Sequence, residues 1–527
     1  MNLFKSIATF GGFTLLSRIT GFFRDIVLAN FLGAGLASDA FFVAFKLPNL
    51  FRSLFAEGAF TTAFVPMLSQ KLVCEDKKNA VLFAAKAISV LAVFVGLFVI
   101  LIEIFMPWVI TVLAPGFVDD AGKIELATEL SRITFPFLLF ISIVSFQSGI
   151  LNSLNKFAAP AAAPVILNLM MVASVLVFVP FSSTAAHGIA LGVTVAGFIE
   201  ILWLTYFLHK ENIYIRPQTN IIEIIKDNEI KTLFKRIAPG VLGAGIYQIN
   251  MVVDTILVSI VGTGAISWLY YANRLQQLPL GVVGAAISVA VLPVLSRHIK
   301  ANENDEAKNV QSKAFEYGAL LSIPAAVALV VLARPIVNIL FQHGRFGVEE
   351  TIMTSKAVVA YAIGLPAYVL VKSLAPNFFA RGDTKTPVKY SMIVLLTNLL
   401  FAVILMQPFG HVGIATATTI AAFVSLWQYI RGLKKREFWT CSKDLVKKTI
   451  KICFCSVIMG VVLFLSQEAL NFSFGNWLHL TIFPKILLFL FVCILGFVTF
   501  VFCAKFSGVL DIKEVVSNLI KKRKNNA

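Results

Sequence analysis

Charge is scarce in this chain. Only 14% of the 527 residues are Asp, Glu, Lys or Arg, whereas 58% are hydrophobic and the mean hydropathy is +0.85. The chain also lacks a long polar stretch that could form a separate soluble domain. Instead, stretches of about 20 apolar residues recur from one end to the other, and this is the length of a helix that crosses a bilayer. The composition excludes a soluble protein and predicts an all-α polytopic membrane protein.

The motifs of metal, redox and hydrolytic chemistry are missing as well. The six cysteines include no CxxC pair, and the six histidines include no HExxH spacing. There is no P-loop, no carboxylate-rich DDxxD-like cluster and no Ser-centred elbow. The sequence therefore predicts a protein that is not an enzyme and has no cofactor. Without an ATP site, uphill transport would need an ion gradient or the membrane potential.

The net charge of +17 has a membrane explanation rather than a nucleic-acid one. Lys and Arg concentrate in alternate connections between apolar runs, near residues 67–79, 209–233, 297–313, 381–389 and 432–451. The opposite connections are nearly free of them, except for 334–349. Cytoplasmic loops carry such an excess of basic residues, so the pattern predicts that both termini are cytoplasmic. Arg18 and Arg24 interrupt the first apolar run, which indicates a retained first span rather than a signal peptide.

About fourteen spans are predicted. Their approximate positions are 6–28, 38–66, 80–105, 126–151, 158–180, 186–208, 234–261, 267–296, 311–333, 352–380, 387–406, 412–431, 447–467 and 482–505. Two further segments, 213–236 and 509–524, mix Ile or Val pairs with charges. They are predicted to be amphipathic helices on the inner leaflet, although a solvated end explains the second equally well.

An internal repeat indicates two lobes. FTTAFVPMLSQ (60–70) matches ISVAVLPVLSR (287–297) without gaps, and a weaker echo relates 135–151 to 365–381. Spans 1–6 and 7–12 therefore read as two pseudo-symmetric six-helix lobes, with two C-terminal helices outside the repeat. The predicted domains are an N-lobe (1–210), a cytoplasmic interfacial linker (211–233), a C-lobe (234–432), the last two spans (433–510) and a cytoplasmic basic tail (511–527).

Charges inside the first two spans are the main functional signal. They are Arg18, Arg24, Asp25, Asp39, Lys46, Arg52 and Glu57. An ionised side chain at the bilayer centre costs roughly 2.5–3.5 kcal/mol even on lenient scales, so such residues are expected to face a protein interior or a wet cavity. Arginine binds phosphate and carboxylate bidentately, which favours an anionic guest. The alternative is mutual pairing, of Arg24 or Arg18 with Asp25, of Lys46 with Asp39 or Glu57, and of Arg274 with Asp254.

Three runs of this sequence resemble a known family. SRITGFFRDIVLANFLGAGLASDAFFVAFKLPNLFRSLFAEGAFTTAFVPMLSQ (17–70), YYANRLQQLPLGVVGAAISVAVLPVLSR (270–297) and ARGDTKTPV (380–388) are similar to the MurJ/MviN lipid II flippases of the MOP superfamily. The resemblance covers essentially the whole chain. It implies a central cationic cavity between two lobes and a groove for the lipid tail formed by the last two spans.

The resemblance also implies roles for individual residues. The functional arginines of the family match Arg18, Arg24, Arg52 and Arg274, which would bind the pyrophosphate, with Asp25, Asp39, Lys46 and Glu57 as supporting charges. Some members bind sodium, and Asp254, Asn377 and Thr397, with Ile393, match parts of that site. This chain departs from the pattern at Arg381, where those members carry an acid, and at Asn273, where some carry an acid before the second-lobe arginine.

The expected function is movement of lipid II, undecaprenyl-pyrophosphoryl-disaccharide-pentapeptide, from the cytoplasmic to the outer leaflet of the bacterial inner membrane by alternating access. The expected driving force is sodium or the membrane potential, and the expected partners are lipid II and membrane lipids, with no nucleic acid and no required oligomer. Three alternatives stay open: a flippase for another polyprenyl-linked glycan, a MATE-like ion-coupled exporter, and an intramembrane enzyme acting on polyprenyl phosphates.

Overall fold

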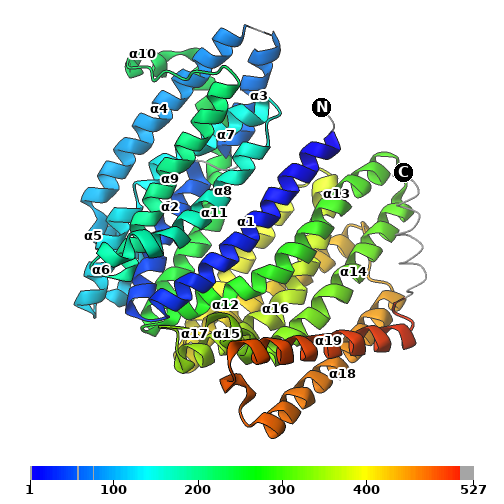
Figure 1. The fold of residues 1–527 in the computed structure, drawn as a ribbon. Helices are drawn as coiled ribbons and strands as arrows, with labels where there is room; N and C mark the ends of the chain where they lie inside the picture. The colour runs from blue at the N-terminus through cyan, green and yellow to red at the C-terminus, as the bar shows by residue number, and fades with distance from the viewer. Residues whose placement is uncertain (1–2, 56–58, 75, 511–527) are drawn as a thin grey trace. The chain divides into compact units, whose positions relative to one another are not determined.

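The computed structural model describes residues 3–55, 59–74 and 76–510, which are almost entirely helical (Figure 1). No strand occurs in these ranges, so the all-α prediction is confirmed. Ten helices within them are long and apolar enough to cross a membrane. The larger count of about fourteen spans stays a prediction.

The chain forms two compact units. Unit 1 comprises Met1–Ser267 with His343–Phe346, and unit 2 comprises Trp268–Gln342 with Gly347–Ala527. The helix that covers the predicted seventh span therefore lies in unit 1. The lobe boundaries drawn from the repeat remain predictions, because this division follows compactness rather than internal symmetry.

Unit 1 contains eleven helices in the part of the chain that the structure describes, with short 3₁₀ turns at Pro115–Phe117 and Val179–Phe181. The helices are α1 (Leu3–Leu32), α2 (Leu36–Phe55), α3 (Ala59–Cys74), α4 (Lys77–Ile104), α5 (Met106–Leu113), α6 (Ala121–Thr134), α7 (Phe137–Ser153), α8 (Ala158–Val177), α9 (Ala185–Lys210), α10 (Ile221–Lys226) and α11 (Asn228–Val261). Within this unit, α1 packs against α8, α2 against α6, and α7 and α8 against α9.

The helix α12 (Ala265–Pro279) begins at the end of unit 1 and continues into unit 2. A π-helical turn (Leu280–Gly284) and a 3₁₀ turn (Trp477–His479) accompany the other helices of unit 2. These are α13 (Ala285–Lys300), α14 (Asn304–Val331), α15 (Ala333–Phe341), α16 (Val348–Ala380), α17 (Lys385–Lys435), α18 (Lys443–Phe474) and α19 (Ile482–Phe506). Helix α16 packs against α14 and α17, and α18 packs against α14 and α19.

Local sequence explains where several of these helices begin and bend. The side chains of Thr184 and Ser442 accept hydrogen bonds from backbone N–H groups of the first turns of α9 and α18, as good N-caps do. The predicted spans 387–406 and 412–431 run through α17, which is interrupted at Gly410 by non-helical dihedrals with φ of 55°. Glycine populates this region without a Cβ penalty, so the chain can change direction there.

The second copy of the sequence repeat contains an irregular helical turn. α12 ends at Pro279, the π-helical turn Leu280–Gly284 follows, and α13 starts at Ala285. In the first copy, residues 56–58 between α2 and α3 lie outside the described residues. The matched segments 60–70 and 287–297 lie in α3 and α13, each with a proline inside, Pro66 and Pro293.

The prediction of one amphipathic helix over residues 213–236 was wrong. Residues 213–220 are not helical, α10 has only six residues, and α11 begins at Asn228. Pro217 and the turn at Asp227 account for the difference, because proline disfavours a helical conformation at the residue before it and Asp227 caps the following helix. Of the second predicted amphipathic segment, 509–524, residues 511–524 lie outside the described residues.

The last two helices share one core with the rest of unit 2. Leu463 of α18 and Val492 of α19 are buried in a cluster that includes Leu370 of α16 and Leu433 of α17. The outward face of α19 remains apolar, with Phe491 60% exposed and similar residues along its length. An apolar exposed face on a helix of this hydropathy is what a bilayer requires.

Candidate functional site

Arg24 is fixed deep inside unit 1. It is 4% exposed on α1, and its Nε and Nη2 donate to Oδ1 of Asp25 at 3.0 and 2.7 Å. Its Nη1 donates to Oδ1 of Asn168 at 2.9 Å, and its Cζ lies 5.7 Å from the ring centre of Phe45. The predicted pairing of Arg24 with Asp25 is therefore present. The guanidinium is held in one orientation by partners from α1, α2 and α8.

Asn168 of α8 is a site residue that the sequence reasoning missed. Its Nδ2 donates to the backbone oxygen of Ser17 at 3.0 Å and to Oγ1 of Thr20 at 3.3 Å, both on α1. A Cβ on Gly21 would lie 3.2 Å from this amide, so a glycine there suits the close packing of α8 on α1. The available signal was a single amide in the apolar predicted span 158–180.

Arg18 and Arg52 differ from Arg24 in their surroundings. Arg18 is exposed on α1, whereas Arg52 is half-buried in the last turn of α2. Glu200 of α9, which is 1% exposed, interacts electrostatically with Arg52. The sequence reasoning missed Glu200, although an acid inside the predicted span 186–208 could have indicated it.

The alternative pairing of Lys46 with Asp39 is wrong. Asp39 is fully buried, and its Oδ2 accepts from Nζ of Lys123 at 2.9 Å, where Lys123 is itself 2% exposed. The carboxylate also accepts from the backbone N–H groups of Gly264 at 2.7 Å and Ser267 at 2.9 Å, and from the Ser267 hydroxyl. Lys46 instead donates to Oγ1 of Thr255.

The reason for this difference lies beyond helical spacing. Lys123 sits at the start of α6, just before the predicted span 126–151, and reaches Asp39 only through the packing of α6 on α2. Asp39 therefore links α6 to the N-terminus of α12. Lys123 neutralises its negative charge within unit 1. Glu57, the other predicted partner of Lys46, lies outside the described residues.

Arg274 of α12 is half-buried in unit 2. Its Nη2 donates to the hydroxyl of Tyr270 at 3.3 Å, and its Cζ lies 5.4 Å from the centre of that ring. Tyr270 precedes it by one helical turn, so the two side chains share a face of α12. The tyrosine thereby orients the guanidinium.

The residues matched to a sodium site have other bonds. Asp254 of α11 accepts from Nδ2 of Asn250 at 3.4 Å, and Oγ1 of Thr397 donates to the backbone oxygen of Ile393 at 2.8 Å. Asn377 is fully buried on α16. No group of three or more His, Cys, Asp or Glu side chains suited to a metal ion occurs among the residues that the structure describes.

The side-chain and backbone oxygens of Asn377 both accept hydrogen bonds from Arg381. Its Nη1 donates to Asn377 Oδ1 and, at 3.2 Å, to the backbone oxygen of the same residue. Asn377 Nδ2 donates to Oε1 of Gln311 at 3.1 Å, which fixes the orientation of the amide, and the Arg381 Cζ lies 4.0 Å from the Phe438 ring centre. A guanidinium thus sits where a sodium ligand set needs an acid, and the residues of unit 2 do not fit that ion.

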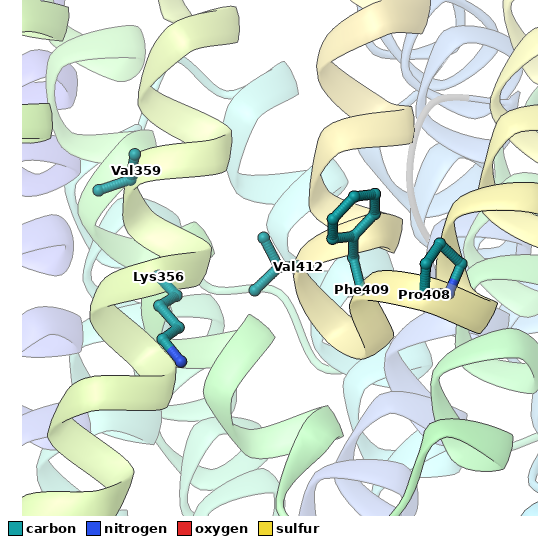
Figure 2. A pocket seen from close by; sticks show the side chains of 5 residues that line it. All are labelled: Lys356, Val359, Pro408, Phe409 and Val412. Atoms are coloured by element: carbon teal, nitrogen blue, oxygen red, sulfur yellow. The ribbon is translucent and has the colours of Figure 1, made fainter.

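An open pocket of about 500 Å³ lies between α16 and the interruption of α17 in unit 2 (Figure 2). Lys356 and Val359 line it from α16, and Pro408, Phe409 and Val412 from α17. It offers one positive charge beside an apolar wall, and none of the predicted site residues lines it.

Comparison with known proteins decides the family. Residues 28–484 match the family model of the lipid II flippase MurJ. The chain belongs to this family. A probable lipid II flippase MurJ of Rhizobium tropici is 35% identical over 530 residues, covering 99% of this chain and 98% of the relative. Another, of Haemophilus influenzae, is 33% identical and covers 92% of this chain and 96% of the relative.

Solved structures agree with this membership. A lipid II flippase MurJ in an inward closed conformation is similar with a TM-score of 0.78 and 27% identity, covering 94% of this chain and 98% of that one. An inward-facing multidrug resistance MATE transporter of the MOP superfamily gives a TM-score of 0.64 at 16% identity, covering 80% of this chain and 96% of that one. The second likeness shows the fold alone.

Membership of the MurJ family fixes several coarser properties. The relatives are named as flippases, which are transporters rather than catalysts, so the chain is not an enzyme. Together with the apolar helices, the family makes it a multi-pass inner-membrane protein of peptidoglycan biosynthesis.

Proposed function

We propose that this protein moves lipid II from the cytoplasmic to the outer leaflet of the inner membrane. Membership of the lipid II flippase MurJ family, over nearly the whole chain, is the observation that carries this proposal. The substrate pairs an undecaprenyl tail with a pyrophosphate and a disaccharide-pentapeptide. The protein must therefore carry an anionic head group past the bilayer core while the tail stays in apolar surroundings.

The proposed head-group site is formed by Arg18, Arg24, Arg52 and Arg274. Guanidinium groups suit a pyrophosphate because they donate two parallel hydrogen bonds and stay charged. Arg18 is exposed and ready for such a contact, whereas Arg24 is held in place by Asp25 and contributes positive charge from a fixed position. Arg52 is half-buried at the end of α2, and it would add its positive charge to the same site.

The proposed mechanism is alternating access. An inward-open state admits the head group, the two lobes rock about it, and an outward-open state releases it. The basic loops support cytoplasmic termini, because they alternate with nearly charge-free connections. Helices α18 and α19, with their apolar outward faces, are proposed to guide the lipid tail.

The proposed driving force is the membrane potential rather than sodium. Each elementary charge that crosses 100 mV gains about 2.3 kcal/mol, which is enough to bias a charged head group or a charged lobe. The guanidinium of Arg381 against Asn377 opposes a bound sodium ion. Flipping should therefore persist when sodium is replaced by potassium at constant potential, and should fall when the potential is collapsed. A strict sodium requirement would contradict this part of the proposal.

The head-group site is tested by charge removal at matched positions. Arg18→Ala is expected to abolish complementation of cells depleted of the protein, while Arg18→Lys retains part of the activity. Arg431→Ala, which removes an exposed arginine that stacks on Trp427 of α17, is the control and should complement fully. Equal growth with Ala at all four site arginines would refute the anionic site. Accumulation of another polyprenyl-linked glycan instead of lipid II would leave the fold and change the substrate.

A further inference from the structure

The open pocket of about 500 Å³ in unit 2 has no part in the proposed head-group site (Figure 2). Four of its five lining residues are apolar, Val359 of α16 and Pro408, Phe409 and Val412 of α17, and the fifth is Lys356 of α16. No acid is among these five. The lining therefore suits a molecule with a negative group and an apolar body.

The pocket lies at one end of the membrane spans. Three of its lining residues flank the interruption of α17 at Gly410, which separates the predicted spans 387–406 and 412–431. From the other side, Lys356 lines it about two turns after the start of α16 at Val348. Lipid phosphates lie at the ends of membrane spans, outside the hydrocarbon core. The ammonium of Lys356 is thus within reach of the lipid head groups.

The Lys356 ammonium is available to a ligand. The side chain is exposed, and no hydrogen bond or ion pair joins it to another residue in the described part of the chain. Glu349 shares its face of α16 but lies two turns earlier, about 10 Å along the helix axis. An exposed positive charge without a counter-ion beside an apolar wall favours an anionic group from outside the chain.

An apolar track leads from Lys356 along α16. Ile352, Lys356, Val359 and Ile363 are spaced by four, three and four residues, so their side chains share one face of the helix. Ile352 is 36% exposed and Ile363 is 51% exposed, although most of α16 is buried. An acyl chain attached to a phosphate at Lys356 would therefore extend over Val359 and Ile363.

We propose that this pocket binds an anionic phosphoglyceride of the bilayer, with its phosphate on Lys356 and an acyl chain along Val359 and Ile363. Lysine binds phosphate as a point charge, and the apolar walls give the chain close van der Waals contacts. A zwitterionic phosphoglyceride is disfavoured, because its own ammonium would lie beside Lys356 with no acid in the lining to accept it. The site does not depend on the proposed flipping function, since none of the four proposed head-group arginines lines it.

The test measures which lipids contact α16 in liposomes that contain the full-length protein. Ile363→Trp places a fluorescent reporter on the apolar track, about 10 Å from Lys356 along the helix axis. The signal of the six native tryptophans is subtracted with the protein that lacks the reporter. Quenching by brominated phosphatidylglycerol in phosphatidylethanolamine, and by the reverse mixture, gives the local lipid ratio. We expect phosphatidylglycerol to be enriched about fivefold over the bulk mixture, as one lysine near an anionic lipid contributes.

Variants of Lys356 assign the enrichment to its charge. Lys356→Met should return the lipid ratio at the reporter to the bulk value, Lys356→Arg should keep the enrichment, and Lys356→Glu should lower the ratio below the bulk value. Lys389→Met is the matched control, because it removes an exposed lysine of α17 that does not line the pocket, and it should keep the enrichment. A second reporter, Phe491→Trp on the exposed face of α19, should show the bulk ratio in every variant. All these positions are exposed, so the variants are expected to fold.

Four results would overturn the proposal. Lys356 selects no lipid if the ratio at the Ile363→Trp reporter equals the bulk ratio. Other groups bind the anionic lipid if the enrichment survives in Lys356→Met. The site takes free phosphate if soluble glycerol 3-phosphate removes the enrichment. The bilayer does not reach the pocket if neither brominated lipid quenches the reporter.

Discussion

At the scale of single residues, the buried Arg24 of α1 is held by one partner close in sequence and by one that is far away. Asp25 is its neighbour in the chain, and their pairing could be predicted from adjacency. Asn168 lies on α8 and meets Arg24 only after α8 has packed on α1. Helical spacing describes one helix at a time, so it could not supply the second partner.

Asn168→Leu tests this network. The change removes the amide oxygen that accepts from Arg24 Nη1 and the amide N–H that donates to the backbone oxygen of Ser17. We expect a loss of stability of roughly 1–3 kcal/mol from these buried groups, seen as a lower unfolding temperature in detergent. Leu169→Ala changes the adjacent, half-exposed residue and should stay within about 0.5 kcal/mol of wild type. Equal effects of the two variants would contradict the role of Asn168.

A pH dependence is expected at the turn after α16. Hydrogen bonds from Thr386, with a further contribution from Arg436, hold the pKa of the Asp383 carboxyl below its usual range. A depressed folded pKa stabilises the protein above the unfolded value of about 3.9 and loses this contribution as the pH falls through the folded value. The unfolding temperature of wild type should therefore exceed that of Asp383→Asn at pH 7, and the gap should close below about pH 4. A gap independent of pH would exclude the carboxylate as its source.

At the scale of helices, the pair of Asp39 and Lys123 organises one end of unit 1. The carboxylate caps the first turn of α12 from another helix, through Gly264 and Ser267, while Lys123 neutralises it from α6. The sequence indicated that Asp39 needed a partner in the membrane. It could not identify Lys123, which lies outside the predicted spans.

Lys123→Met is expected to be more harmful than removal of the whole pair. It leaves Asp39 buried without a counter-charge, which costs roughly 3–5 kcal/mol. Asp39→Asn with Lys123→Met restores neutrality, so it should unfold at a higher temperature than Lys123→Met alone. A double-mutant cycle on thermal unfolding measures this coupling. Additive effects would show that the two residues do not act as a pair.

The breaks between helices were predictable only in part. The spans 387–406 and 412–431 were expected as separate helices, and α17 is interrupted between them at Gly410. The segment 213–220 was misread, because the Ile pairs that suggested a helix lie after it, in 221–225, and Pro217 disfavours a helical conformation at the residue before it.

Gly410→Ala should destabilise the protein, and Gly96→Ala should not. Gly410 has φ of 55° and ψ of −133°, where a Cβ is strained, at a cost of roughly 1–3 kcal/mol. Gly96 lies inside α4 with open space around an added Cβ, so alanine there should gain up to about 1 kcal/mol from helix propensity. Gly410→Ala should unfold at a lower temperature than wild type, and Gly96→Ala at a higher one. A shift in the same direction in both variants would contradict this prediction.

At the scale of the whole molecule, composition predicted the class of protein but could not predict its substrate. Apolar length predicted a polytopic helical protein, and the repeat predicted two related halves. The likeness to a multidrug resistance MATE transporter at 16% identity shows that this fold also occurs in a protein with another guest, so fold alone does not choose one. The family membership supplies the choice, and the arginines of α1, α2 and α12 are the residues proposed to recognise the head group.

The most direct test is the sidedness of lipid II in cells depleted of this protein and complemented with wild type, Arg18→Ala, Arg274→Ala or the control Arg431→Ala. We predict that lipid II stays on the inner leaflet after depletion and with both site variants, and reaches the outer leaflet with wild type and the control. An unchanged distribution of lipid II after depletion would contradict the proposed function.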